Sequence, residues 1–331
     1  MAQVNNSELR DEYFSILEEN ETELRKEITE FVRAAGQSKN LTRLVDGHVL
    51  GRARFFFNSI FPWIETYLDL ETAVAAEFGP GSGSTTVPLA LKCKKVHAFD
   101  ISPSSTNVLR TRASFFKDID LELHVQDHLE NLNKLSEIAP VDLVLMFAVL
   151  EHMTLEERLE ALTAAWSALS EGGILVIGDT PNRLVYQHKH TSHMPFFDML
   201  PTRLIREYTK QMPNAAFADS LSKWMAEGQT DEMINAKIDR WGRGVSFHEL
   251  DIAIGSLSDV VASDGLAPNL LKAMPIQPSE PLLMRFLAQE VPTVPLGFAR
   301  ASLYLILQKG GRRNAQAYPA ETVKILLGSV C

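Results

Sequence analysis

A glycine-rich turn preceded by an acidic residue is the segment of this sequence best suited to chemistry. Gly79, Gly81 and Gly83 alternate with other residues directly after the apolar run 73–78. Glycines let a strand-to-helix turn bend sharply and let a ligand approach the backbone closely. Glu77 stands just before the turn, where a carboxylate suits a ligand with an ammonium group better than a second phosphate. The turn therefore predicts a nucleotide-like ligand that carries a positive charge.

Two further acids end the next two apolar runs. Asp100 lies 23 residues after Glu77 (100 minus 77), a distance typical of an acid that accepts hydrogen bonds from ribose hydroxyls. Asp127 is placed to accept from an adenine amino group. Each acid also has a plain structural interpretation, because Asp100 can cap a helix and Asp127 can end a polar strand. Taken with Glu77, the two acids favour S-adenosylmethionine as the ligand.

Five segments, in this order and spacing, resemble the class I S-adenosylmethionine-dependent methyltransferases, and in particular the broad group related to quinone-biosynthesis enzymes. The segments are Glu77-Phe78-Gly79-Pro80-Gly81-Ser82-Gly83, Phe99-Asp100-Ile101-Ser102, Gln126-Asp127, Val149-Leu150-Glu151-His152-Met153 and Leu169-Ser170-Glu171-Gly172-Gly173-Ile174-Leu175. The resemblance covers roughly residues 70–182. One such segment is weak evidence, whereas five in order indicate fold and cofactor together.

The resemblance implies an enzyme that uses S-adenosylmethionine as its cofactor. It implies that Glu77 holds the methionine amino group, that the first two glycines pass beneath the cofactor and that Asp100 binds the ribose. The cofactor-binding residues expected on this basis are Glu77, Gly79, Gly81, Gly83, Asp100, Ile101, Asp127, His128 and Phe147.

The residues that serve the methyl acceptor are expected after the fourth and fifth apolar runs. His152 lies near where the family places the acceptor and is the first candidate for a base, although a structural role is equally open. His190 and His193 belong to a histidine-rich segment, 186–197, and are further candidates for base or hydrogen-bond donor. Arg183, Phe196 and Trp241 are expected to bind substrate, with surface ion pairs and helix packing as the alternative.

The pattern His188-x-His190-x-x-His193 also invites a metal interpretation. Because no nearby cysteine or carboxylate completes a site there, we predict no metal. Methyl transfer mainly requires an oriented acceptor, and a base is needed only for a protonated one. We therefore predict O-methylation of an aromatic hydroxyl or carboxylate on a small molecule. The alternatives are N- or C-methylation of a small metabolite, or a non-catalytic S-adenosylmethionine-binding protein.

The elements that must position these residues follow from the alternation of apolar runs with helical segments. This rhythm predicts an α/β, Rossmann-like doubly wound sheet with crossover helices. We expect strands at 73–78, 95–99, 121–125, 141–147, 174–177 and 301–308, and helices at 86–92, 104–116, 155–169 and 195–208. Glu249 stands three residues after Ser246, as in a capping box that starts a helix. The aromatic stretch 52–64 is expected to be a buried helix face.

Four regions are expected along the chain. They are an N-terminal helical cap over 1–70, a cofactor-binding core over 71–184, a substrate lid insertion over 185–245 and the C-terminal part of the core sheet over 246–331. We expect the cap and the insertion to close over the site.

The composition agrees with a folded enzyme acting on small molecules. Of 331 residues, 45% are apolar and 22% charged, as in ordinary globular chains. The net charge of -10 argues against nucleic acid as a partner. No apolar run approaches the roughly 18 residues of a membrane helix. Cys93 and Cys331, the two cysteines, suit a reduced, cytoplasmic protein. A homodimer is left open.

Overall fold

The computed structural model describes residues 6–34, 40–188, 191–310, 318 and 322. Its sheet has seven strands in the order β3-β2-β1-β4-β5-β7-β6. The strands are β1 (Val74–Phe78), β2 (Lys95–Asp100), β3 (Leu121–Val125), β4 (Val141–Phe147), β5 (Leu169–Pro181), β6 (Val261–Asp264) and β7 (Ser302–Gln308). The predicted α/β doubly wound fold is confirmed.

The sheet is mixed rather than wholly parallel. β2 pairs in parallel with β1 and with β3, whereas β6 and β7 pair antiparallel. Neither β6 nor its antiparallel pairing was expected, because its four residues form too short a run to stand out in the sequence. The strand order reverses at β1, and in such sheets ligands bind beyond the carboxyl end of the strands at that point.

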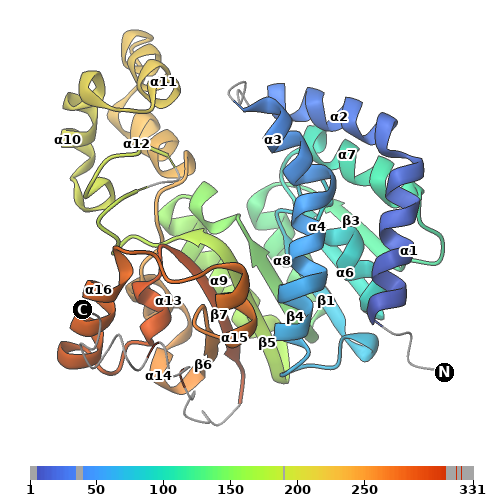
Figure 1. Ribbon diagram of the computed structural model, residues 1–331. Coiled ribbons are helices and arrows are strands. Elements are labelled where there is room, and N and C mark those ends of the chain that lie inside the picture. The colour runs from blue at the N-terminus through green and yellow to red at the C-terminus, as the bar shows by residue number, and fades with distance from the viewer. Residues whose placement is uncertain (1–5, 35–39, 189–190, 311–317, 319–321, 323–331) are drawn as a thin grey trace. The chain divides into compact units, whose positions relative to one another are not determined.

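The chain divides into two compact units, and β4 and β5 each contribute residues to both. The first unit comprises Met1–Leu145 and Ala168–Ile174. Its helices, blue to green in Figure 1, are α1 (Asn6–Glu19), α2 (Glu21–Ala34), α3 (Leu41–Asp46), η1 (Gly47–Gly51), α4 (Arg52–Phe55), η2 (Phe56–Ile60), α5 (Phe61–Ile64), η3 (Leu70–Thr72), α6 (Thr86–Lys92), α7 (Pro103–Ser114) and α8 (His128–Ile138).

The N-terminal helices pack as their apolar spacing predicts. Leu17 of α1 and Leu24 and Ile28 of α2 are fully buried. The aromatic stretch forms one continuous helical run from α3 to α5, in which Phe56 and Phe61 are buried. Its interpretation as a packing face is therefore confirmed.

The second unit comprises Met146–Ser167 and Leu175–Cys331. Its helices are η4 (Leu150–His152), α9 (Leu155–Ala168), η5 (Phe197–Met199), α10 (Thr202–Glu207), η6 (Thr209–Gln211), α11 (Ala215–Ala226), α12 (Asp231–Arg240), α13 (Phe247–Ile254), α14 (Leu257–Val260), α15 (Pro268–Ala273), α16 (Glu280–Glu290) and η7 (Leu296–Ala299). Helices α10, α11 and α12, yellow to orange in Figure 1, gather around a hydrophobic cluster of their own.

Two expectations for the second unit need correction. The helix expected over 195–208 is limited to Thr202–Glu207, because Pro195 instead pairs with Gln187 in an isolated antiparallel bridge. The apolar run 174–177 is only the middle of the 13-residue strand β5. The capping box of Ser246 and Glu249 is present at the start of α13, as predicted.

None of the helices in the described ranges is long and apolar enough to form a membrane span.

Candidate functional site

The glycine turn after β1 has the backbone conformation that its composition predicts. Gly79, Gly81 and Gly83 have φ of 70°, 51° and 70°, values that favour glycine. The Gly79 amide donates to the carbonyl of Phe99 in β2 at 2.9 Å. A Cβ on Gly83 would lie 3.0 Å from Leu109 of α7. The turn is therefore held against β2 and α7, and its open backbone can approach a ligand.

Glu77 lies at the end of β1 and is almost completely buried. Its Oε1 accepts a hydrogen bond from the hydroxyl of Thr85 at 2.5 Å. Its Oε2 is buried without a hydrogen-bond partner among the described residues. Burial raises the pKa of Glu77 to about 7. A buried carboxylate oxygen that lacks a donor is a site for a cation.

Asp100 at the end of β2 reaches back to the glycine turn. Its Oδ2 accepts from the Gly81 amide at 3.4 Å and from the Ser105 hydroxyl at 3.1 Å. Its Oδ1 accepts from the Ser102 amide at 2.8 Å. The helix that follows is capped by Ser102 rather than by Asp100. Ribose binding by Asp100 stays a prediction, for which Oδ1 retains one lone pair. The next residue, Ile101, is 60% exposed.

Asp127 and His128 lie at the start of α8. The Asp127 side chain accepts from the Glu130 amide at 2.9 Å and caps the helix, so the polar strand-end interpretation fits this residue. Asn131 of the same helix is buried and donates to the carbonyls of Asp100 and Gln126. It thus links the ends of β2 and β3, a role that no spacing in the sequence signals.

Arg112 of α7 supports the glycine turn from below. It is completely buried, and its Nε donates to the Ser82 carbonyl at 3.1 Å. Its other nitrogens donate to the Tyr13 hydroxyl and to the carbonyls of His48 and Val49. No pattern in the sequence predicts this role, because the four partners of Arg112 come from three distant segments.

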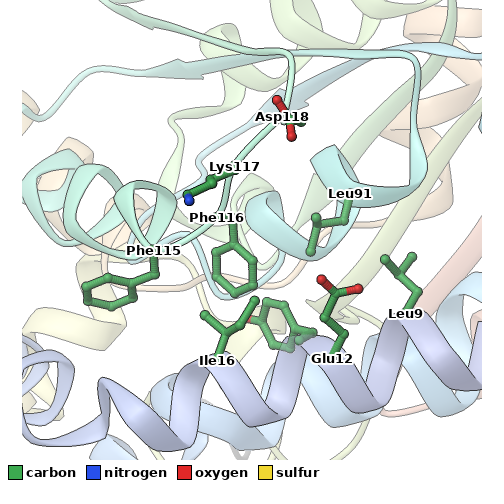
Figure 2. Close-up of a pocket in the computed structure, with 9 residues that line it drawn as sticks. Leu9, Glu12, Ile16, Leu91, Phe115, Phe116, Lys117 and Asp118 are labelled. Carbon is green, nitrogen blue, oxygen red and sulfur yellow. The ribbon is translucent and has the colours of Figure 1, made fainter.

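A separate cavity of about 350 Å³ lies beside Tyr13 in the first unit. Figure 2 shows side chains of α1 facing those of the α7–β3 connection across it. Its lining is Leu9, Glu12, Tyr13, Ile16, Leu91, Phe115, Phe116, Lys117 and Asp118. It contains none of the residues predicted to bind cofactor or substrate.

In the second unit, the end of β4 has an unusual backbone. Ala148 has a φ of 52° and Asp179 of β5 a φ of 50°, a region that side chains other than glycine rarely adopt. Phe147 is buried, and a Cβ on Gly178 would lie 2.6 Å from its ring. Such strain clusters at functional sites, which makes Asp179 a candidate that the sequence did not single out.

His152 follows β4 in the short helix η4 and is exposed. Its Nδ1 lies 3.0 Å from the carbonyl oxygen of Arg240, the last residue of α12. A carbonyl only accepts hydrogen bonds, so Nδ1 carries a proton in this contact. Nε2 lies 4.0 Å from Oε1 of the buried Glu151.

The two ends of the histidine-rich segment pair with each other: the His188 amide donates to the Met194 carbonyl at 3.1 Å, and the Phe196 amide donates to the Tyr186 carbonyl at 2.7 Å. His190 lies outside the described residues. His193 is exposed with a φ of 57°, and its carbonyl accepts from the Gln187 side chain at 2.8 Å. Phe196 also has a φ of 57°, and half of its side chain is exposed. The exposed imidazole and phenyl ring are both open to a ligand.

Arg183 and Trp241 both make protein contacts. Arg183 donates from Nε to the Gly244 carbonyl at 3.1 Å, and its Nη1 lies 3.6 Å from Glu249 Oε1. Trp241 packs against Phe217 and Trp224, with ring centroids 5.4 Å away in each case. These contacts fit the packing alternative, and substrate binding by either residue stays a prediction.

His188 is the buried histidine of this segment. Its Nε2 lies 3.0 Å from the Gly242 carbonyl and its ring stacks on Phe197 at 5.0 Å. Burial lowers its pKa, although Asp198 at 3.7 Å opposes the shift. His188 thus anchors the turn that carries His193 and Phe196.

The first unit therefore offers a set of contacts that fits S-adenosylmethionine. Oε2 of Glu77, which lacks a hydrogen-bond donor, suits the amino group of the cofactor. The glycines let the cofactor approach the backbone, and Asp100 lies beside the turn as a possible acceptor for the ribose hydroxyls. The exposed Ile101 suits an apolar contact with the adenine ring.

Sequence comparison supports this fit. Residues 76–175 match the family model described as a methyltransferase domain. That span contains the glycine turn, both strand-end acids and His152. No curated protein has a sequence that matches this chain significantly.

Several solved structures resemble the chain at low identity. A magnesium protoporphyrin IX methyltransferase from Synechocystis PCC 6803 is 14% identical over 80% of this chain and 87% of its own, with a TM-score of 0.43. PKMT2 from Rickettsia typhi is 16% identical over 77% of this chain and 52% of its own, with a TM-score of 0.45. An O-methyltransferase family protein from Burkholderia thailandensis is 11% identical over 92% and 72%, with a TM-score of 0.41.

Proposed function

We propose that this chain, an S-adenosylmethionine-dependent methyltransferase whose methyltransferase domain lies at residues 76–175, methylates an oxygen atom of a small molecule. The enzyme class and the cofactor are those predicted from the sequence. The proposal concerns the acceptor, for which we favour an aromatic hydroxyl or carboxylate.

Different residues are proposed to bind different parts of S-adenosylmethionine. We propose that Glu77 pairs with the amino group of the cofactor, that Asp100 accepts from the ribose hydroxyls, and that Asp127 and His128 border the adenine. Gly79, Gly81 and Gly83 leave the backbone open beneath it. When bound, S-adenosylmethionine supplies a methyl group on a sulfonium leaving group. The protein must then hold the acceptor oxygen in line with that methyl, an orientation effect on the order of 7 to 11 kcal/mol.

The hydrogen bond between His152 Nδ1 and the Arg240 carbonyl is the observation that carries the choice of an oxygen acceptor. With Nδ1 committed to the Arg240 carbonyl, Nε2 can take the proton of a phenol as its oxygen attacks. A carboxylate acceptor needs no base. Phe196 and Trp241 supply apolar surface for a planar acceptor, and Arg183 supplies a cation for an acidic one.

His152→Asn tests the base directly. The asparagine amide can still donate to the Arg240 carbonyl, but it has no basic nitrogen. We expect its kcat for phenolic acceptors to fall by about 10²- to 10⁴-fold, while the methylation of aromatic carboxylates and the Kd for S-adenosylmethionine stay unchanged. The measurement is formation of S-adenosylhomocysteine with a panel of both acceptor classes.

His248→Asn is the matched control, since His248 is another exposed histidine of the second unit. Equal losses for phenols and carboxylates in His152→Asn would assign His152 a structural role. Turnover limited to amines or carbon acceptors would favour the alternative N- or C-methyltransferase. Cofactor binding without turnover on any acceptor would favour a non-catalytic binding protein.

We infer further that the acceptor is not a nucleic acid. The net charge of -10 repels phosphate backbones at long range. We keep the four regions 1–70, 71–184, 185–245 and 246–331 as part of the proposal, with residues 185–245 setting the choice of acceptor.

A further inference from the structure

We propose that His97, Glu122 and His124 form a binding site for a divalent transition-metal ion of the zinc type on strands β2 and β3. The proposed methyl transfer uses none of these three residues, although they lie within the span 76–175 that matches the family model. The site is also distinct from the histidine-rich segment 186–197, for which the sequence predicts no metal.

The strand register brings the three side chains to one face of the sheet. His97 is directly opposite Glu122 in the parallel pair β2–β3, and Phe99 is opposite His124. Because side chains alternate along a strand, residues two apart share a face. Glu122 and His124 therefore lie on the same face as His97. β3 is the edge strand of the sheet, which leaves one side of the cluster open to an ion.

The distances between the candidate ligand atoms match those of a tetrahedral zinc site. His97 Nδ1 lies 3.2 Å from His124 Nε2, and 3.4 Å from Glu122 Oε2. His124 Nε2 lies 3.7 Å from Glu122 Oε1. Zinc bonds of about 2.0 to 2.2 Å to nitrogen and oxygen place neighbouring tetrahedral ligands about 3.3 to 3.6 Å apart. The two nitrogens and a carboxylate oxygen of Glu122 thus lie close enough together to bind one ion, with either oxygen of Glu122 as the third ligand.

Packing restricts the orientation of both candidate imidazole ligands. His97 and His124 are buried, and the His124 ring stacks on Phe99 with centroids 4.8 Å apart and planes at 20°. Glu122 is exposed, which leaves the remaining coordination position to water.

Imidazole and carboxylate ligands in this number favour zinc and its neighbours over calcium or magnesium, which prefer sites made of oxygen alone. Three protein ligands and an open position are also the ligand set of zinc sites that retain a water molecule. The probe ion for the site is therefore Zn²⁺.

Lys95 is the group that competes with the ion. Its Nζ lies 3.1 Å from Glu122 Oε2 and 4.0 Å from Asp120 Oδ1. The side chain is one-third exposed, so it can turn to Asp120 and release Glu122. Lys134 of α8 adds positive charge near His124. The affinity for the metal should accordingly rise when Lys95 is neutralised.

A metal at this site would cross-link β2 and β3, the strands that lead to the proposed cofactor residues Asp100 and Asp127. His97 lies three residues before Asp100, and His124 three residues before Asp127. The ion would therefore stabilise the β2–β3 edge without touching the cofactor.

Calorimetric titration of the untagged, chelator-treated full chain with ZnCl₂ tests the proposal. We expect one Zn²⁺ per chain. The affinity for Zn²⁺ should fall by at least about a hundredfold in His97→Gln and in His124→Gln. Substitution of a residue that only contacts a metal ligand typically costs less. The affinity should rise severalfold in Lys95→Gln. Co²⁺ in place of Zn²⁺ should give the intense visible absorption of a tetrahedral site.

His248→Gln controls for adventitious binding to an exposed histidine and should leave the Zn²⁺ affinity unchanged. Glu122→Gln changes only an exposed side chain and keeps the test valid if either histidine variant fails to fold. The absence of Zn²⁺ binding in the wild-type chain would overturn the proposal, as would full affinity in Glu122→Gln together with either histidine variant. The Kd for S-adenosylmethionine, measured on the same samples, should not change in Lys95→Gln.

Discussion

The protonation state of Glu77 should affect cofactor binding if Glu77 pairs with the amino group as we propose. Its pKa of about 7 lies above the ordinary value of 4.5 because the side chain is buried. In the free protein the neutral carboxyl is the stable form below pH 7. The ammonium of the cofactor instead favours the carboxylate, so binding must remove the proton at acidic pH.

We therefore predict that the affinity for S-adenosylmethionine rises as the pH increases from about 5 to about 7, by up to about tenfold per pH unit. In Glu77→Gln the affinity should be lower and should lose this pH dependence. Calorimetric titrations of both proteins at a series of pH values measure the effect. A wild-type affinity that is flat over this range would contradict the role given to Glu77.

The raised pKa of Glu77 also makes the free energy of unfolding of the cofactor-free chain depend on pH. Because the pKa of Glu77 is higher in the folded chain than in the unfolded chain, its contribution to folding is fully present below about pH 4.5 and is lost as the pH rises through about 7. Glu77→Gln removes this part of the pH dependence of unfolding.

Single residues could be predicted where their neighbours in sequence formed a pattern. Glu77 and Asp100 stand next to the glycine turn or at a fixed distance from it, so the pattern identifies them. Arg112 and Asn131 could not be found, because the backbone groups to which they donate lie in other segments. The protonated nitrogen of His152 depends on Arg240, 88 residues away.

Two constraints favour glycine in the turn after β1, the backbone conformation and the close packing of helix α7. At Gly81 the constraint is conformational, because its φ is 51° and the nearest atom to an added Cβ is 4.0 Å away. At Gly83 the turn also lies against α7, where an added Cβ would meet Leu109 at 3.0 to 3.1 Å.

We predict that Gly83→Ala destabilises the chain more than Gly81→Ala does. Gly81→Ala should cost about 1 to 2 kcal/mol for the left-handed backbone. Gly83→Ala adds an overpacking cost of typically 1 to 3 kcal/mol to the same penalty. Urea unfolding of the two variants compares them. Equal losses of unfolding free energy would mean that α7 moves away from the turn without cost.

Elements with a strong period were predictable and irregular ones were not. Strands β3 and β4 and helix α6 have the predicted bounds, because uniform apolar runs or helical spacing define them. Helix α16 lies in a proline-rich segment from which no helix was expected. Its proline stands in the first turn, where the missing amide is not needed.

At the scale of the whole molecule, the order of five segments was enough to predict the sheet, the enzyme class and the cofactor. The acceptor was not predictable, because the residues proposed to meet it lie in segments without a period. The cluster around Phe197 and Phe217 shows that residues 194–241 pack on one another. Such packing is built from side chains that meet only in the folded chain.

Our main proposal is that the turn after β1, together with Asp100, binds S-adenosylmethionine. Its most direct test is calorimetric titration of the wild-type chain with S-adenosylmethionine and with NADH, repeated on Asp100→Ala and Asp69→Ala. Asp69 is a matched control, because its Oδ1 accepts from the amide two residues on, at 3.1 Å, as Asp100 does. We expect the wild-type chain to bind S-adenosylmethionine and not NADH. Asp100→Ala should weaken this binding, and Asp69→Ala should leave it unchanged. Normal binding by Asp100→Ala, or no binding by the folded wild-type chain, would contradict the proposal.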